Sequence, residues 1–278
     1  AVTALLKELP TLDNLTELKA GSHYLEHRVN GKSHRRWVVV NGNDVYLGIP
    51  GQGLVEWRRL DGPKFGDYFI NLSRPRWSNE INEAKDLIDG NSMDIKDAYN
   101  FLEDILNRGW KFQNQIEDCQ YLSAAMMLNS VCAALPRQLY TIINGTRGSG
   151  KSSFLSLLTG ANPTMRVLEA SFGMDSYTEA GFRKEMNNCS LGAVLDEFED
   201  VGGDSHSKNV REILKDVRGL TSNPECRILR GNSDNKESTS YTLKCQIWAA
   251  AIQYLRDEAD ISRFIQVHTV LVEGHPPP

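Results

Sequence analysis

The sequence predicts an α/β fold in which a parallel β-sheet is flanked by helices and preceded by a small β unit and a helical segment. Strand-like and helix-like patterns alternate from residue 139 onward, which is typical of a parallel sheet with helices on both faces. Short β-like runs come before residue 75, and helical periodicity occupies much of the stretch between them. The predicted regions are therefore 1–75 (mainly β), 76–135 (helical) and 136–278 (the α/β domain).

The first region contains β-like runs separated by turn sequences such as Asn41-Gly42 and Pro50-Gly51. We expect these runs to form a small antiparallel unit. They lie at 36–40, 44–49, 53–57 and 67–70. A basic stretch from His27 to Arg36 precedes them, and we interpret it as a solvated charged loop in preference to a phosphate-binding face.

The elements of the later regions are predicted from periodicity and from flanking glycine and polar residues. Helical periodicity runs over 81–106 and 121–135, with Gly109-Trp110 between the two stretches. In the α/β domain we expect strands at 139–143, 166–168, 191–195 and 247–252, and helices at 151–158, 179–186 and 210–218.

Composition limits the class of protein. The 278 residues are 40% hydrophobic, which is enough to bury a sizeable core, and no apolar run is long enough for a membrane span. The N-terminus lacks the features of a secretion signal, so we expect a soluble, cytoplasmic protein with no membrane partner. The net charge of -5 excludes a uniformly basic coat for nucleic acid but leaves room for a local basic strip.

The five cysteines are widely spaced and include no Cys-x-x-Cys pair. This pattern predicts neither a disulfide framework nor a zinc site, and it favours buried, reduced thiols.

The strongest functional signal is a glycine-rich segment between a predicted strand and a predicted helix. It has the pattern Gly-x-x-x-x-Gly-Lys-Ser over Gly145 to Ser152, which is a P-loop. Glycines allow successive backbone N–H groups to face one anion, and the helix N-terminus adds a positive dipole. Lys151 can bridge the terminal phosphates of ATP, and the Ser152 hydroxyl can bind Mg²⁺. The predicted nucleotide-binding residues are Gly145, Thr146, Arg147, Gly148, Ser149, Gly150, Lys151, Ser152 and Ser153.

Two adjacent acids end the strand predicted at 191–195. Neighbouring strand residues point to opposite sides, so these two carboxylates can take different roles. We expect Asp196 to hold Mg²⁺ directly or through water, and Glu197 to orient and deprotonate the water that attacks the terminal phosphate. An acidic pair at a strand end is weak evidence alone, and its position some 45 residues beyond the P-loop strengthens it.

Two further residues are candidates at the end of the chain. Gln253 ends the apolar strand predicted at 247–252, where an amide can contact the attacking water or the terminal phosphate; an ordinary polar residue at a strand end is the alternative. Arg263 follows shortly afterwards, where ring ATPases carry an arginine that reaches the nucleotide of the neighbouring subunit, although a single arginine is more often surface charge.

Between the acidic pair and Gln253, two β-like runs flank the polar segment 232–237 and predict a β-hairpin with a cationic tip. Lys236, with Arg227 and Arg230, could grip a phosphate backbone inside a channel without reading its sequence. A solvated surface hairpin is the equally weighted alternative.

Together these residues resemble the AAA+ class of P-loop ATPases, and within it the superfamily 3 helicases of phage and plasmid primase-helicase proteins. The resemblance covers about residues 120–272 and depends on the short interval from Lys151 to Asp196, the hairpin before the Gln253 strand and the Ser-Arg263-Phe264 ending. It implies a homo-oligomeric ring, usually a hexamer, with ATP and Mg²⁺ between subunits, single-stranded DNA as partner and a primase module upstream. It also implies that Gln253, where the family usually has Asn, acts as a sensor and that Arg263 acts in trans.

Three functional classes follow. The favoured class is ATP-driven translocation on DNA or its unwinding during replication of a phage or mobile element. The alternative is an AAA+ ATPase that remodels protein or acts in defence or DNA packaging. A GTPase or small-molecule kinase is disfavoured, because the nearest match to a guanine-specific Asn-Lys-x-Asp string, 235–238, lacks the Asp.

Overall fold

The computed structural model describes most of the chain, which divides into two compact units, Ala1–Ser78 and Asn79–Pro278. Each unit is treated separately below. The described residues are 16–18, 21–29, 32–41, 44–49, 53–56, 64–65, 68–70, 95–129, 132, 135, 137–159, 171–174, 177–190, 192–200, 205–222, 228–231, 238–252, 255 and 257–272.

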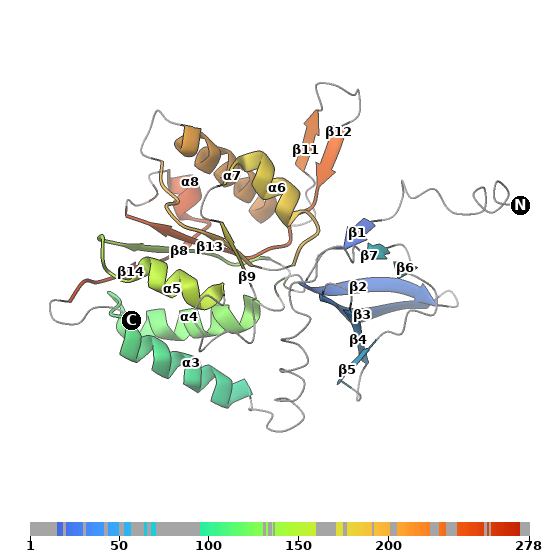
Figure 1. The fold of residues 1–278 in the computed structure, drawn as a ribbon, viewed down its shortest axis with the longest axis horizontal. Coiled ribbons are helices and arrows are strands. Elements are labelled where there is room, and N and C mark those ends of the chain that lie inside the picture. Colours follow the sequence, from blue (N-terminus) through green and yellow to red (C-terminus); the bar gives the residue numbers. More distant parts are fainter. Residues whose placement is uncertain are drawn as a thin grey trace, which may run out of the picture. The chain divides into compact units, whose positions relative to one another are not determined.

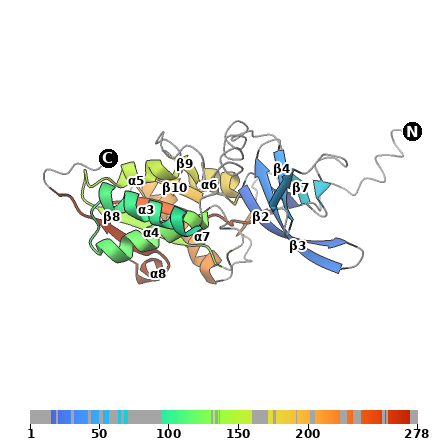
Figure 2. The same cartoon turned by 90° about the horizontal axis from the view of Figure 1, so that it is seen from below.

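The first unit consists of two small sheets. Strands β2 to β5 form an antiparallel four-stranded sheet in chain order, and Figure 2 labels β2, β3 and β4 of this sheet. β1, β7 and β6 form a three-stranded sheet in which β1 and β7 run parallel. Leu25, Val38 and Val40 are buried in the larger sheet. The strands are β1 (Thr16–Leu18), β2 (Gly21–Val29), β3 (Lys32–Asn41), β4 (Asp44–Ile49), β5 (Gly53–Glu56), β6 (Lys64–Phe65) and β7 (Tyr68–Ile70).

The basic stretch from His27 to Arg36 lies mostly in strands, so its prediction as a loop was wrong. β2 and β3 pair antiparallel over nine residues, as far as Val29 opposite Lys32. The sequence contains a signal for this hairpin, because the intervening dipeptide is Asn30-Gly31, the preferred composition of a two-residue hairpin turn. Charged residues obscured the β pattern here, since strand propensity depends strongly on context.

The second unit is an α/β domain with a parallel five-stranded sheet in the order β14-β8-β13-β10-β9. This confirms the predicted fold class. Its helices are α3 (Ile95–Gly109), α4 (Gln115–Asn129), α5 (Lys151–Leu158), α6 (Glu179–Met186), α7 (Ser205–Ser222) and α8 (Glu258–Ile261). Its strands are β8 (Tyr140–Gly145), β9 (Ser171–Met174), β10 (Gly192–Leu195), the hairpin strands β11 (Ile228–Gly231) and β12 (Ser238–Tyr241), β13 (Ile247–Ala251) and β14 (Ile265–Thr269).

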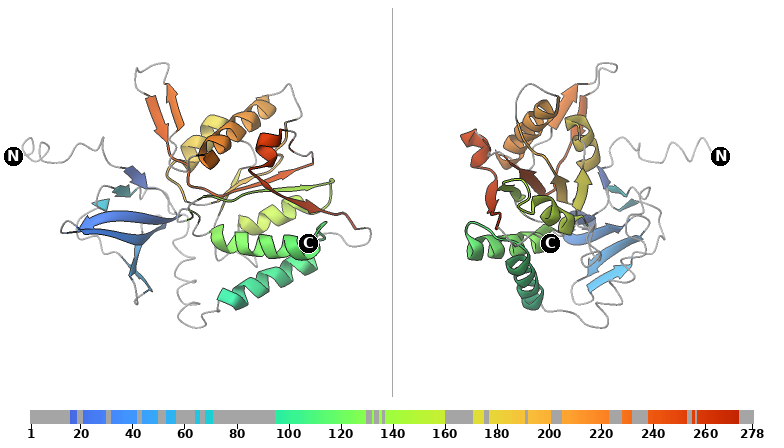
Figure 3. Two further views of the ribbon diagram at one scale, coloured as in Figure 1. Left: turned by 180° about the vertical axis from the view of Figure 1, so that it is seen from behind. Right: turned by 60° about the vertical axis from the view of Figure 1, so that its left-hand side comes forward.

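Helices cover both faces of the parallel sheet, as Figures 1 and 3 show. α3, α4 and α5 lie on one face, where Leu106, Leu122, Phe154 and Trp248 belong to one buried cluster. α6, α7 and α8 lie on the other face. Burial of almost every residue of strands β8, β10 and β13 explains why they are mostly apolar.

Most predicted elements of this domain agree with the structure, but several boundaries differ. α4 begins at Gln115, six residues before the predicted start at Tyr121. The earlier start is stabilised by the Asp118 carboxylate, which accepts a hydrogen bond from the Asn114 N–H at 3.0 Å, an interaction that caps the first turn. The strand predicted at 166–168 and the start of the helix predicted from 81 lie outside the described residues. None of the described helices is both long and apolar enough to cross a bilayer.

Candidate nucleotide-binding site

The candidate site forms where three parallel strands end next to one another. Asn144 near the end of β8 pairs with Ala251 of β13, and Leu195 at the end of β10 pairs with Ala249 of the same strand. β13 therefore lies between the strand that leads into the glycine-rich loop and the strand that leads into the acidic pair. In open α/β sheets, ligands bind outside the carboxyl ends of the strands, and this edge is such a place.

The loop that follows β8 has a backbone conformation for which glycine is suited. Gly148 has φ 81° and Gly150 has φ 89°, both in the left-handed region that other residues adopt rarely. Gly150 is also the residue before the first turn of α5, and no side chain caps that turn there. The N–H groups of the first turn are thus presented to an anion in place of a capping side chain.

Gly145 is required for a different reason, which is lack of space. A Cβ atom at this position would lie 2.1 Å from Thr269 Oγ1 and 2.8 Å from the Thr269 carbonyl oxygen. The close approach of β14 to the loop allows two hydrogen bonds. Ser149 Oγ and Thr269 Oγ1 lie 2.7 Å apart, and Thr269 Oγ1 donates to the Asn144 carbonyl at 3.0 Å. The last residue of β14 therefore fastens the loop, a role that the sequence did not reveal.

Trp110 is a second support that the sequence analysis did not identify. Its indole Nε1–H donates to the Gly150 carbonyl at 2.9 Å, and this bond is buried. The ring also meets Phe154 of α5 edge to face, with the centroids 5.9 Å apart. The residue just after α3 is thereby joined to the residue that immediately precedes α5. The only local signal was the conspicuous Gly109-Trp110 pair between two helical patterns.

Lys151 is held inside the loop. Its ammonium donates to the carbonyl oxygens of Gly145 at 2.8 Å and Thr146 at 2.9 Å, and the side chain is largely buried. Burial lowers the pKa of Lys151, while the negative charges of Asp196 and Glu199 oppose part of that shift. The loop thus positions the cation before any ligand arrives.

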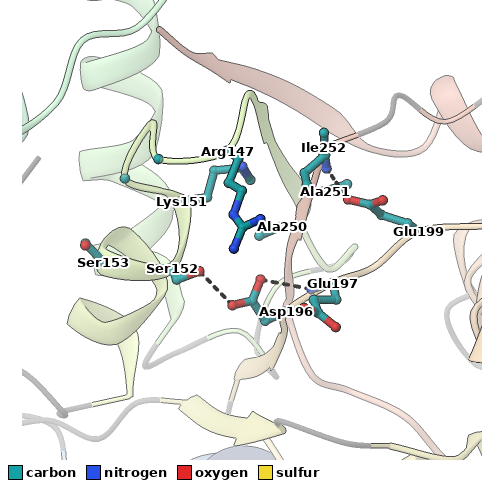
Figure 4. Close-up of a pocket in the computed structure, with 12 residues that line it drawn as sticks. Arg147, Lys151, Ser152, Ser153, Asp196, Glu197, Glu199, Ala250, Ala251 and Ile252 are labelled. Carbon is teal, nitrogen blue, oxygen red and sulfur yellow. Dashed lines mark hydrogen bonds between the residues drawn. The ribbon is translucent and has the colours of Figure 1, made fainter. Parts of the chain in front are cut away.

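The two predicted acids have different surroundings (Figure 4). Asp196 accepts a hydrogen bond from the Ser152 hydroxyl at 2.8 Å through Oδ2, and from the Glu197 N–H at 2.9 Å through Oδ1. Glu197 is exposed, and its backbone φ is 52°. The Asp196 carboxylate and the Ser152 hydroxyl, the two groups expected to bind the metal, are therefore already in contact. The Glu197 carboxylate is accessible to solvent.

These groups share one open pocket of about 540 Å³. It is lined by residues 147, 148 and 150–153 of the loop and α5, by the acids Asp196, Glu197 and Glu199, and by residues 250–252 at the end of β13. Figure 4 shows Arg147 pointing from the loop into this pocket. Gly145, Thr146 and Ser149 do not line it, and their contacts shape the loop instead. A cation, a helix N-terminus, a hydroxyl and carboxylates form a donor set that fits a triphosphate with a divalent metal.

The parallel sheet, the loop after β8 and the acids after β10 together are consistent with a P-loop type fold. The chain matches no known protein family and no curated protein by sequence. Among solved structures it is similar to JCV helicase, determined in complex with a thiazolopyridine-phenoxyphenyl acetamide, at 14% identity and a TM-score of 0.38. The match covers 68% of this chain and 51% of the helicase chain, so this chain spans about half the length of that one.

Glu199 is a pocket acid that the sequence analysis missed. Its carboxylate accepts a hydrogen bond from the Ile252 N–H, and the neighbouring Phe198 N–H donates to the Ala250 carbonyl at 2.8 Å. Both contacts join the segment after β10 to the end of β13. The sequence signal was only the presence of a third acid two residues beyond Glu197, in the segment that follows the strand.

Of the remaining predicted residues that the structure describes, Arg263 does not line this pocket. Arg263 is half-buried, and its guanidinium donates to Thr221 Oγ1 at 2.9 Å, to the Ala259 carbonyl and to Ser262 Oγ at 3.3 Å. Gln253, Arg227 and Lys236 lie outside the described residues. The predicted hairpin is confirmed as β11 and β12, and Arg230 pairs with Thr239 across it.

Proposed function

We propose that this chain binds ATP with Mg²⁺ and hydrolyses the terminal phosphate. The observation that carries the proposal is the bond from the Ser152 hydroxyl to the Asp196 carboxylate, in the pocket that Lys151 also lines. Residues 44 positions apart in sequence meet there as a P-loop hydroxyl and an acid at a strand end. A chance glycine-rich turn would not require this partner.

In the proposed mechanism each residue has one task. The N–H groups at the start of α5 and the ammonium of Lys151 bind phosphate oxygens. Without ligand, two carbonyl oxygens of the loop hold that ammonium beside the pocket that Lys151 lines. Ser152 and Asp196 would hold Mg²⁺, which supplies charge neutralisation at the phosphates when bound. Glu197 accepts the proton of the attacking water, and its exposure leaves it free to meet that water.

We further propose that hydrolysis drives movement along single-stranded DNA or its unwinding, in replication of a phage or mobile element, by a homo-oligomeric ring. Support comes from the residue pattern that resembles superfamily 3 helicases and from the β11–β12 hairpin between the acids and β13. The alternative, an ATPase that remodels protein or acts in defence or packaging, uses the same pocket with another partner.

The first prediction tests both the proposed ATP hydrolysis and its proposed coupling to single-stranded DNA, by measuring ATP turnover and ATP binding. Lys151→Ala should abolish turnover and weaken ATP binding, because it removes the cation that reaches the terminal phosphates. Glu197→Gln should bind ATP within about twofold of wild type while turnover falls by about a hundredfold or more, as expected for loss of a general base. Single-stranded DNA should raise the wild-type rate.

Lys96→Ala serves as the matched control, since Lys96 is an exposed lysine at the start of α3. It should behave as wild type. Retained turnover in Lys151→Ala would overturn the assignment of this pocket as the site of ATP hydrolysis. A wild-type rate that ignores single-stranded DNA but responds to a polypeptide would favour the alternative.

A further inference from the structure

Glu197 has a backbone conformation that needs outside support. Its φ of 52° lies in the left-handed region, where side chains other than glycine rarely occur. Such positions persist where surrounding contacts over-determine them, and they concentrate at functional sites. The direction of the Glu197 carboxylate depends on this backbone turn, because the side chain leaves from its Cα.

Hydrogen bonds hold both peptide groups of Glu197. Its N–H donates to Asp196 Oδ1 at 2.9 Å, and its carbonyl accepts from the Glu199 N–H at 2.8 Å and from His206 Nε2 at 2.7 Å. The first two contacts come from within the same short segment. The His206 contact comes from another element, the first turn of α7, so it fixes the turn relative to the rest of the domain.

His206 is itself fixed by packing. Its ring lies 5.3 Å from that of Tyr177, centroid to centroid, and Tyr177 is buried against Phe198. The segment carrying Tyr177 is tied to α7, because the Asn209 amide donates to the Tyr177 carbonyl at 3.2 Å.

A buried ion pair holds the two helices around His206 together. Arg183 of α6 donates to both carboxylate oxygens of Asp216 of α7, at 2.6 and 2.7 Å. Both side chains are almost completely buried. A two-point contact of this kind restricts sliding and rotation of one helix on the other. The imidazole therefore approaches the Glu197 carbonyl from a rigid support.

We infer that His206 is a positioning residue for the proposed hydrolysis, holding the Glu197 turn so that its carboxylate faces the attacking water. The inference rests on the proposed function and extends it to a residue outside the pocket. His206 does not line the pocket, so in this inference the imidazole acts through the Glu197 backbone. Nucleotide binding should therefore depend little on His206, while the chemical step should depend on it strongly.

The experiment compares three substitutions by kcat, by ATP dissociation constant and by thermal unfolding. His206→Phe keeps a ring against Tyr177 but removes the donor, and kcat should fall by about ten- to a hundredfold, the loss expected from misplacing a reacting group by about 1 Å. ATP binding should stay within about twofold. His206→Gln restores an N–H donor and should recover most of the rate. Lys208→Ala, an exposed change in the same helix, should match wild type.

A double-mutant comparison tests whether His206 acts through Glu197. In single-turnover assays, adding His206→Phe to Glu197→Gln should cost much less than it costs alone, since residues that act as one unit are not additive. Full turnover in His206→Phe, or equal losses on both backgrounds, would overturn the inference while leaving the ATPase proposal intact. A wild-type chain without turnover would overturn the proposed function, and the inference with it.

Discussion

The sequence pattern of the loop does not show why particular residues near the pocket are needed. The glycines at 145 and 148 look alike in the sequence, yet Gly145 is required for lack of space and Gly148 for its φ of 81°. Glu197 has a similar left-handed φ without being a glycine. The fixed spacing of the loop made it predictable that Lys151 and Ser152 lie together at the pocket, because the two are neighbours at the start of one helix. Thr269 and Trp110 could not be predicted, since they reach the loop only through tertiary packing.

The strain at Glu197 leads to a prediction about stability. Glu197→Gly should be more stable than Glu197→Ala by about 1 kcal/mol, because glycine avoids the cost of a left-handed conformation. Both variants lose the carboxylate and should lose turnover equally. Chemical denaturation followed by tryptophan fluorescence measures the difference.

The matched control for this comparison is position 199, where the backbone φ is not positive. There Glu199→Gly should be less stable than Glu199→Ala by about 0.5–1 kcal/mol, the usual order. The same order at both positions would mean that the turn at Glu197 is not strained.

Among the elements, α7 contributes most to the site from a distance. Its first turn contacts the Glu197 carbonyl through His206, its middle is clamped to α6 by Asp216, and Thr221 near its end contacts Arg263. The sequence predicted this helix only over 210–218, because the preceding polar stretch lacks apolar periodicity and resembles a loop. The structure extends it to Ser205–Ser222.

The order of strands could not be predicted either. Apolar runs such as 139–143 and 191–195 identify buried strands. Which strands lie side by side in the sheet depends on how the connecting helices cross over it, and the runs do not show this. β9 is short, and its sequence, Ser-Phe-Gly-Met, shows no clear pattern. β14 was also missed, although its Ile-Gln-Val-His-Thr alternation is a strand signal of moderate strength.

Gly219 allows a test of α7 as an element. It lies within the helix. Apart from its two chain neighbours and the nearby backbone of the helix itself, a Cβ atom added there would have no atom within 4 Å. Gly219→Ala should therefore stabilise the protein by about 0.5–1 kcal/mol, because alanine is the better helix former and fills open space. ATP turnover should not change.

Gly181 of α6 provides the contrast. A Cβ atom there would lie 3.0 Å from Thr178 Oγ1, the oxygen that caps the helix by accepting the Gly181 N–H. Gly181→Ala should gain less than Gly219→Ala or lose stability. Equal gains at both positions would show that the cap at Thr178 adapts without cost.

At the scale of the whole molecule, Arg263 lies away from the pocket of its own chain. α7 has 18 residues, which corresponds to about 27 Å of helix, and it separates the Glu197 contact at one end from the Arg263 contact at the other. Arg263 does not line the described pocket of its own chain, whereas Arg147 does. A role for Arg263 in hydrolysis therefore requires a second copy of the chain.

The last prediction uses this requirement. Arg263→Ala should bind ATP almost normally but lose turnover by about a thousandfold, as expected for an arginine that stabilises the transition state in trans. Lys151→Ala subunits should also be inactive, for lack of a competent pocket. A mixture of the two should recover part of the activity, because an intact Arg263 from one subunit can then meet an intact Lys151 in its neighbour.

The activity recovered in the mixture should depend on assembly of the subunits. This dependence distinguishes an arginine that acts on the neighbouring subunit from one that only stabilises its own chain. Arg263 also donates to Thr221, so its loss can loosen α8 and β14; a folding defect of that kind would lower the thermal midpoint and would not be rescued by Lys151→Ala subunits. Dilution below the assembly concentration should abolish the recovered activity together with that of wild type. If dilute wild-type monomer keeps its full rate and Arg147→Ala removes it, the arginine acts within one chain, through Arg147, and Arg263 has no part in the chemistry.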